Sequence, residues 1–262
     1  MDLGLQNKVA LIAASSTGLG KEVAKRLAME GTKVIICARD KKKLQNTEEE
    51  IKQLGAEVLS IQVDLTHYDQ VKNLVKSGID HFGRIDILVT NCGGPPPGNF
   101  VDFSVDDWKQ AIDLNLMSTI YLCKETIPIM VKQDAGRIIM ITSVSVKQPI
   151  QGLILSNVTR AGVTGLAKSL SNELGVNNIL VNTVCPGYTK TERVESLAET
   201  ISNNRGVEKD QIIQEWAQMN ALKRLATPEE FANAVVFLAS NKASHITGTS
   251  IQIDGGYVKS LL

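Results

Sequence analysis

The residues from Ala14 to Gly20 form a turn of small side chains, and their place in the chain predicts anion binding. A short apolar run of strand length, Val9 to Ile12, precedes the turn, and apolar residues recur at helical spacing after it. A helix that begins directly after such a turn presents unpaired N–H groups to a phosphate or pyrophosphate. The candidate cofactor ligands of this turn are Ala14, Ser15, Ser16, Thr17, Gly18, Leu19 and Gly20.

Such a turn can also be a tight strand-to-helix connection without a ligand. The context favours the binding interpretation, because a second strand, Lys33 to Cys37, follows the helix after Gly31, a plausible C-cap. The unit is therefore a candidate for dinucleotide binding.

Strand and helix patterns alternate along all 262 residues. We predict strands at 9–12, 33–37, 58–63, 85–90, 138–142, 179–184 and 251–253. Right-handed crossovers then give an α/β fold, a doubly wound parallel seven-stranded sheet with helices on both faces, in a single domain over 1–262. This is a Rossmann fold.

Three capping signatures predict where helices begin. They are Thr66 with Asp69, Ser104 before a long helix that runs to about Val131, and Thr227 followed by Pro228.

Ligands of doubly wound sheets bind at the carboxyl ends of the strands, so the residues that follow each strand are the ones to inspect. Those that we expect to bind the cofactor are Arg39, Asp64, Leu65, Asn91, Cys92, Gly93, Pro186, Gly187, Tyr188 and Thr191.

Composition excludes several classes of function. Lys plus Arg equals Asp plus Glu at 28 each, so no net charge favours nucleic acid or an anionic membrane as a partner. The four cysteines contain no C-x-x-C pair and the three histidines are scattered, so we expect no metal site and no disulfide framework. No leader sequence and no membrane-spanning run is found, and we expect a cytoplasmic protein with reduced thiols.

The turns resemble, in type and order, the motifs of the short-chain dehydrogenase/reductase family over essentially the whole chain. The matching motifs are the turn to Gly20, Asn91-Cys92-Gly93, Asn115, Ser143, Pro186-Gly187 with Thr191, Ile246-Thr247-Gly248 and Asp254-Gly255-Gly256. The chain looks most like the 3-oxoacyl-carrier-protein reductase and glucose dehydrogenase type of member. The resemblance implies an NAD(P)(H)-dependent oxidoreductase with a catalytic centre at Asn115 and Ser143.

The chain departs from the family pattern at the glycine-rich turn. Ala13 and Ala14 replace the threonine and first glycine of the family. A Cβ at position 14 either forbids a positive φ or indicates that the turn does not need one, and we expect cofactor binding to survive.

A second departure lies at the catalytic centre. The family's Tyr-x-x-x-Lys begins thirteen residues after the serine, where this chain has Ser156 and Arg160. In the family the tyrosine donates a proton to the carbonyl oxygen, and the lysine lowers the pKa of the tyrosine and holds the nicotinamide ribose. A displaced Tyr68-x-x-x-Lys72 has the right spacing but falls on the helix after the third strand.

Ser156 and Arg160 are four residues apart, so both face the same side of a helix. Ser156 is at best a relay, since an aliphatic hydroxyl is not readily tuned toward neutrality. Arg160 suits a carboxylate, a phosphate or a developing oxyanion, and its alternative is a structural ion pair. The resemblance assigns Asn115 to a water chain that ends at the lysine.

Three functions stay open at this point. They are an oxidoreductase with an unusual centre that acts on an unknown carbonyl or alcohol, a cofactor-binding pseudoenzyme that serves as a sensor or assembly partner, and a non-redox lyase or isomerase.

The end of the second strand predicts a preference for NADP(H) over NAD(H). Ala38 stands where NAD-binding members carry an acidic residue, and Arg39 after it can pair with a 2′-phosphate. Lys41 to Lys43 add positive charge, unless they form a solvated face that Glu48 to Glu50 balance.

The segment 191–225 contains two amphipathic helices separated by Asn203 to Gly206, and we predict a mobile lid over the substrate. The resemblance also implies a homotetramer or dimer. Two leucines at the end of the segment Tyr257 to Leu262 agree with burial against a partner.

Overall fold

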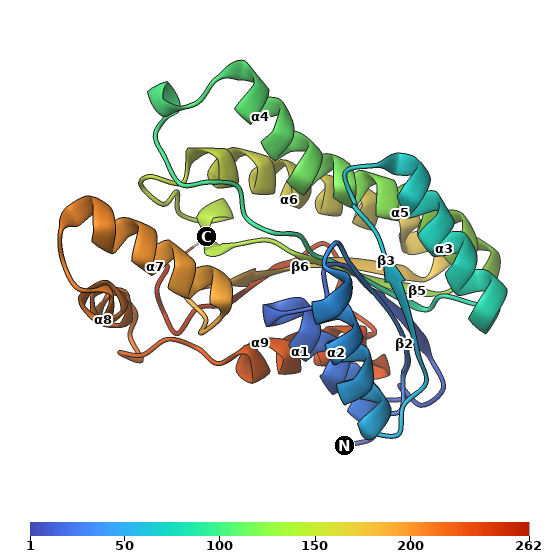
Figure 1. Ribbon diagram of the computed structural model, residues 1–262. Coiled ribbons are helices and arrows are strands. Elements are labelled where there is room, and N and C mark those ends of the chain that lie inside the picture. The colour runs from blue at the N-terminus through green and yellow to red at the C-terminus, as the bar shows by residue number, and fades with distance from the viewer. Residues whose placement is uncertain (262) are drawn as a thin grey trace.

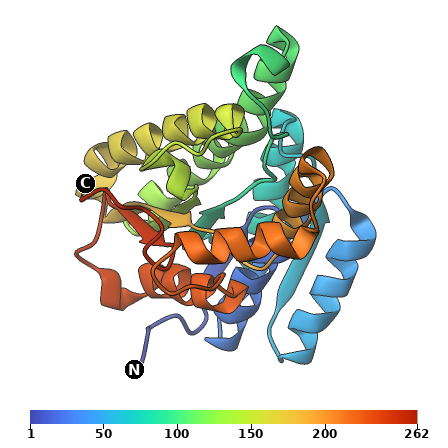
Figure 2. The same cartoon turned by 90° about the vertical axis from the view of Figure 1, so that its left-hand side faces the viewer.

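The computed structural model describes residues 1–261 and contains a seven-stranded parallel sheet in the order β3-β2-β1-β4-β5-β6-β7. Helices cover both faces of this sheet (Figures 1 and 2). The strands are β1 (Val9–Ile12), β2 (Lys33–Ala38), β3 (Val58–Gln62), β4 (Ile87–Thr90), β5 (Gly136–Ile141), β6 (Ile179–Pro186) and β7 (Ser250–Ile253). The predicted doubly wound fold is confirmed.

Two layers of helices bury the sheet. The helices are α1 (Gly18–Met29), α2 (Lys41–Gln53), α3 (Tyr68–Phe82), α4 (Val105–Ile112), α5 (Ser118–Gln133), α6 (Ile154–Leu174), α7 (Glu192–Arg205), α8 (Lys209–Met219) and α9 (Pro228–Ala239). Helices α1, α2 and α9 supply the core on one face, whereas α3, α5 and α6 supply it on the other. The strands read as nearly continuous apolar runs because they are covered on both faces.

The strand order reverses at β1, which lies between β2 and β4. Ile12 at the end of β1 pairs with Ile36 of β2 on one side and with Val89 of β4 on the other. The connections from β1 and β4 leave in opposite directions, and this opens a crevice at the carboxyl ends of the two strands.

Two of the three predicted caps are confirmed and one is wrong. Ser104 and Thr227 each form a capping box, and Pro228 is the first residue of α9. Thr66 does not cap α3, which has His67 at its N-cap. The Thr66 hydroxyl instead donates to the Asp64 carboxylate at 2.8 Å, which joins it to the loop before α3.

The helix predicted to run from Ser104 to Val131 is interrupted by a π-helical turn, Asp113–Met117, between α4 and α5. Single π-helical turns of this kind are frequent at functional sites. Asn115 lies in the middle of this one.

Helices α7 and α8 lie at one end of the sheet, beside neither of its layers (Figure 1). Their apolar faces pack on each other through Leu197, Ala198, Ile212 and Trp216. Gly206 ends α7 with a φ of 65°, a left-handed conformation that glycine adopts without strain. Within residues 1–261, no helix has the length and apolar character needed to cross a membrane.

Candidate active site

A cavity of about 510 Å³ opens at the carboxyl ends of the strands, where the strand order reverses. The turn after β1, the loop after β4, the end of β5, the start of α6 and the β6–α7 connection all contribute to its wall. Of the predicted site residues, those that line it are Ala14, Ser16, Thr17, Gly18, Leu19, Arg39, Asp64, Leu65, Asn91, Cys92, Gly93, Ser143, Ser156, Arg160, Pro186, Gly187, Tyr188 and Thr191.

Ser15, Gly20 and Asn115 do not belong to this wall, and each has a supporting position instead. The Ser15 hydroxyl is fully buried and donates to the carbonyl of Ile12 at 2.9 Å. A Cβ on Gly20 would lie 2.5 Å from the carbonyl oxygen of Ala14, so only glycine permits this approach of helix to turn.

Ala14 adopts a φ of 46°. Both expectations for this position are therefore wrong, because the turn requires a positive φ and the alanine adopts it. A left-handed conformation costs a non-glycine residue about 1–2 kcal/mol. The strain lies in the turn itself.

The N-terminus of α1 faces the cavity, and in the described part of the chain no side chain caps its free N–H groups. Thr17 is the N-cap and makes no side-chain capping bond to the described chain, and the first turn of α1 contains no acidic residue. The helix dipole and the free N–H groups favour an anion here.

Charged residues at the α2 side of the cavity are mostly engaged with one another. Asp40 caps α2 by accepting from the backbone N–H of Lys43, and Lys43 Nζ lies 2.7 Å from Glu192 of α7. Glu48 pairs with Lys52, and Glu50 pairs with Lys21 and Lys25, so these glutamates do not balance the lysines at 41–43. Arg39 is exposed and lines the cavity.

Two asparagines fix the loop after β4. Asn91 Nδ2 donates to the carbonyl of Ala14 at 3.2 Å, and Asn115 Nδ2 donates to the carbonyl of Gly93 at 3.3 Å. Asn115 also accepts from Thr159 of α6 at 3.4 Å. Asn115, which is 1 % exposed, thus joins the π-helical turn to this loop and to α6.

Ser156 and Arg160 do face the cavity from one side of α6, as the spacing predicts. Arg160 Nε donates to Ser156 Oγ at 3.1 Å, and its Nη1 donates to the carbonyl of Thr142 at 3.0 Å. A longer bond of 3.4 Å joins Nη1 to the carbonyl of Ile141. The structural ion pair considered for Arg160 is not found among residues 1–261, because its partners are a hydroxyl and two carbonyls of the β5 end.

Ser143 begins the loop after β5. Its Oγ accepts from the backbone N–H of Ser145 at 3.1 Å. The hydroxyl hydrogen is not used in that bond, so it can be donated toward the cavity.

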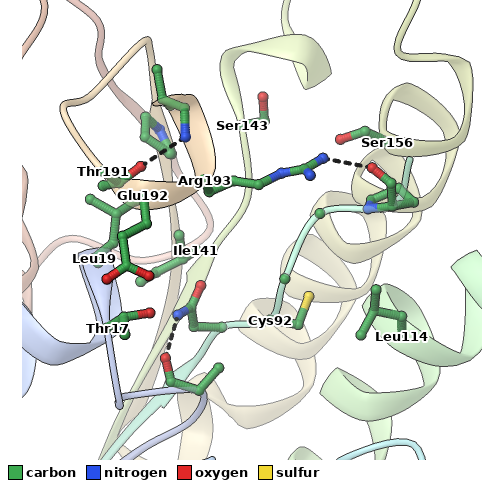
Figure 3. A pocket seen from close by; sticks show the side chains of 18 of the residues that line it. Thr17, Leu19, Cys92, Leu114, Ile141, Ser143, Ser156, Thr191, Glu192 and Arg193 are labelled. Atoms are coloured by element: carbon green, nitrogen blue, oxygen red, sulfur yellow. Dashed lines mark hydrogen bonds between the residues drawn. The ribbon is translucent and has the colours of Figure 1, made fainter. Parts of the chain in front are cut away.

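Arg193 was not among the predicted site residues, and it lines the cavity from the first turn of α7. Its side chain extends across the cavity to the loop after β4, where Nη2 donates to the carbonyl of Pro95 at 2.7 Å (Figure 3). The residue as a whole is exposed, but its guanidinium lies against Gly94 and Pro95. Desolvation of this group, and next the charge of Arg160, lower the pKa of Arg193. An arginine two residues after Thr191 is the only signal for it in the sequence.

The tyrosines of the chain do not replace a phenol at this centre. Tyr68 bonds Glu125 on the α3 side of the molecule and is not part of the cavity wall. Tyr188 does line the cavity, stacked on Trp216 with ring centroids 4.3 Å apart. Burial raises the pKa of Tyr188, whereas a proton donor at neutral pH needs a lowered one.

Comparison with known proteins shows what the chain is similar to. The family model described as Enoyl-(Acyl carrier protein) reductase matches residues 13–258. An uncharacterised oxidoreductase of Bacillus subtilis is 34% identical over 265 residues, covering 100% of both chains. A 3-oxoacyl-[acyl-carrier-protein] reductase of Staphylococcus epidermidis is 34% identical over 251 residues, 95% of this chain and 98% of its own. The structure of L-sorbose reductase from Gluconobacter frateurii, complexed with NADPH and L-sorbose, has a TM-score of 0.95 at 32% identity and covers 100% of both chains.

Proposed function

Because the chain belongs to the short-chain dehydrogenase/reductase family, we propose that it is an NADP(H)-dependent oxidoreductase that acts on a carbonyl or alcohol substrate. One observation carries the proposal. A single cavity joins the phosphate-binding turn after β1 to the hydroxyl and guanidinium groups of Ser143, Ser156 and Arg160. A cofactor bound at the turn and a substrate beside those groups would share the same space.

The residues of the turn fit a dinucleotide. The free N–H groups at the start of α1 suit the pyrophosphate, and Gly20 lets the helix approach the turn closely. Asn91 and Pro186 to Thr191 would border the nicotinamide end. When bound, the cofactor supplies the hydride, and the protein supplies position and electrostatics.

Hydroxyl and guanidinium donors would stabilise the negative charge that develops on the substrate oxygen. Ser156 Oγ accepts from Arg160, which leaves its own hydrogen to donate into the cavity, as does that of Ser143. Neither serine is acidic enough to supply the proton itself, so Ser156 would relay it from water. This centre stabilises an oxyanion better than it protonates one.

The preference for NADP(H) would come from Arg39. Its side chain lines the cavity beside Ala38, and the buried end of β2 presents no carboxylate there. Lys43 contributes less than its position suggests, because Glu192 pairs with it. The solved relative that was crystallised with NADPH supports the same preference.

Helices α7 and α8 would act as a lid, since α7 supplies Glu192, Arg193, Val194 and Leu197 to the cavity wall while its apolar face packs mainly on α8. Closing such a segment excludes water from the reacting groups.

We also propose a homotetramer or dimer. Phe100 and Val101 in the short 3-10 helix before α4 are 69% and 88% exposed, and Val105 at the start of α4 is 72% exposed. A partner copy would cover this apolar group. At the C-terminus Tyr257 packs on Tyr188, Leu261 is exposed, and Leu262 lies outside the described residues. Light scattering that gives a monomer mass at micromolar concentration would exclude this assembly. The balanced charge favours neither a nucleic acid nor an anionic membrane as a partner, and we propose a cytoplasmic protein.

The test of function is a screen of carbonyl compounds with NADPH, followed by the absorbance of the reduced nicotinamide. Steady oxidation by any of them supports the proposal, and Ser143→Ala should slow it about 10²-fold by removing one donor to the oxyanion. Tight NADPH binding without turnover of any compound would favour the pseudoenzyme. The absence of the family's tyrosine and lysine from this centre is the observation that supports this alternative.

A further inference from the structure

Besides Arg39 at the α2 side, two guanidinium groups line the cavity without an ion pair to a carboxylate among residues 1–261. Four other arginines, Arg26, Arg84, Arg205 and Arg224, form ion pairs with aspartate or glutamate. Within residues 1–261, Arg160 and Arg193 form no such pair, and their partners are a serine hydroxyl and backbone carbonyls. Their charges are therefore uncompensated at the same end of one cavity.

The acidic groups of the cavity wall are engaged elsewhere. Asp40 caps α2, Asp64 holds the Thr66 backbone and hydroxyl, and Glu192 pairs with Lys43. Figure 3 shows the Glu192 carboxylate directed toward Thr17 and Leu19, whereas the Arg193 side chain extends in another direction, toward Pro95. None of these three carboxylates forms an ion pair with Arg160 or Arg193 within residues 1–261.

The side chains of Arg160 and Arg193 differ in how firmly hydrogen bonds hold them. Arg160 is fixed by three hydrogen bonds to α6 and to the end of β5. Among residues 1–261, Arg193 of α7 makes one hydrogen bond, to the carbonyl of Pro95. Its remaining N–H groups are available, since a guanidinium has five donors.

We propose that the substrate carries a carboxylate, and that Arg193 together with Arg160 holds this group while the substrate carbonyl lies beside Ser143 and Ser156. The substrate class is a small oxo acid, or the corresponding hydroxy acid. This inference rests on the proposed function. A carboxylate matches the planar donors of guanidinium groups, and its negative charge between the two groups offsets part of their mutual repulsion.

The same contact would couple substrate binding to the lid. A carboxylate would compete with the Pro95 carbonyl for Arg193, so the position of α7 would depend on whether an acid is bound. A neutral substrate offers no such exchange. The acid should therefore be favoured over an uncharged analogue of the same shape.

The test compares acids with their methyl esters, which differ mainly in charge. Pyruvate, acetoacetate and levulinate, each with its ester, are measured with NADPH as kcat/KM in wild type, Arg193→Met and Arg193→Lys. We expect at least one acid to exceed its ester about 10-fold, and Arg193→Met to weaken that acid about 10- to 100-fold through KM. The ester should change little, and Arg193→Lys should retain part of the preference.

Arg205→Met is the matched control, because Arg205 lies on the same helix and pairs with Glu215 on the surface. It should leave acid and ester unchanged. Arg160→Lys is the second variant, chosen over Arg160→Met because the bonds to β5 make a neutral replacement a risk to folding.

The possible outcomes distinguish failure of the carboxylate site from failure of the proposed oxidoreductase function. If esters are reduced as well as acids, or if Arg193→Met weakens both alike, the carboxylate site is wrong while the oxidoreductase stands. If nothing is reduced, calorimetry of the same acids and esters with the NADPH complex decides. Tighter binding of an acid that Arg193→Met abolishes supports the site, and equal or absent binding overturns it.

Discussion

Restoring the family's proton donor should raise the reduction of neutral ketones. The change is Ser156→Tyr together with Arg160→Lys, two positions that already face the cavity from one side of α6. A positioned general acid contributes about 10²–10⁴ in rate, which is about 3–5 kcal/mol at the transition state. We expect kcat/KM for a neutral ketone to rise within that range.

The double change also has a cost in stability that can be worked from the structure. Arg160 donates one bond to Ser156 and two to the β5 carbonyls, of which the 3.0 Å bond to Thr142 is the better. A hydrogen bond from a charged group contributes about 1.5–3 kcal/mol, and lysine can remake one of them. The other two bonds are lost, so a decrease of about 3–6 kcal/mol in the free energy of unfolding is expected, and urea unfolding should record it.

Each single variant is a control. Ser156→Tyr alone would place a phenol beside a guanidinium that is tied to β5, and Arg160→Lys alone would supply a cation with no phenol to tune. Rates for a ketone panel, NADPH affinity by calorimetry and the unfolding midpoint are measured for all three. The reasoning is refuted if the double variant folds and binds NADPH, yet reduces no ketone faster than wild type.

Three further predictions follow from the cavity and its lid. Ala14→Gly should relieve about 1–2 kcal/mol of strain and lose about 0.4–1 kcal/mol to unfolded-chain entropy, so the urea midpoint should rise, and a fall would contradict the strain at φ 46°. Arg39→Asp should reverse the cofactor preference, with NADPH affinity lower and NADH affinity higher by calorimetry, and equal affinities in wild type would already exclude the NADP(H) assignment. Amides of α7 and α8 should exchange faster than those of β1, β4 and β5 and slow when NADPH is added, and exchange as slow as in the strands without that response would exclude the lid.

Local patterns predicted the fold because each strand is an apolar run bounded by turn residues. Ser104 and Thr227 were placed correctly because their capping partners lie three residues away, within the same turn. Thr66 has the same pattern, but its hydroxyl bonds Asp64 in the preceding loop and the helix begins one residue later, which periodicity does not describe. The conformation of Ala14 was predicted wrongly for a related reason, since surrounding contacts can hold an alanine at a positive φ.

Residues of the cavity wall were predictable where they directly follow a strand. They were less predictable where the length of a side chain determines whether it reaches the cavity. Asn115 was predicted as a site residue, yet it does not line the cavity. Its side-chain amide donates to the carbonyl of Gly93 and so supports the loop after β4. Arg193 was missed because its guanidinium reaches Pro95, 98 positions earlier in the chain, and no local pattern records that distance. The group that a long basic side chain contacts can be identified only from the three-dimensional structure.

The replacement of lysine by arginine changes what the centre can do, through geometry as much as through charge. A lysine ammonium is one mobile point of charge that can reach a ribose and tune a phenol. Arg160 is instead held by Ser156 and by the carbonyls of Ile141 and Thr142, so its charge stays fixed beside the two serines. A fixed cation with no proton-donating phenol beside it is suited to bind an anionic group whose position does not change during the reaction. Reduction of a substrate that brings its own negative group to Arg160 and Arg193 is therefore compatible with the loss of the phenol, whereas efficient reduction of a neutral ketone is not.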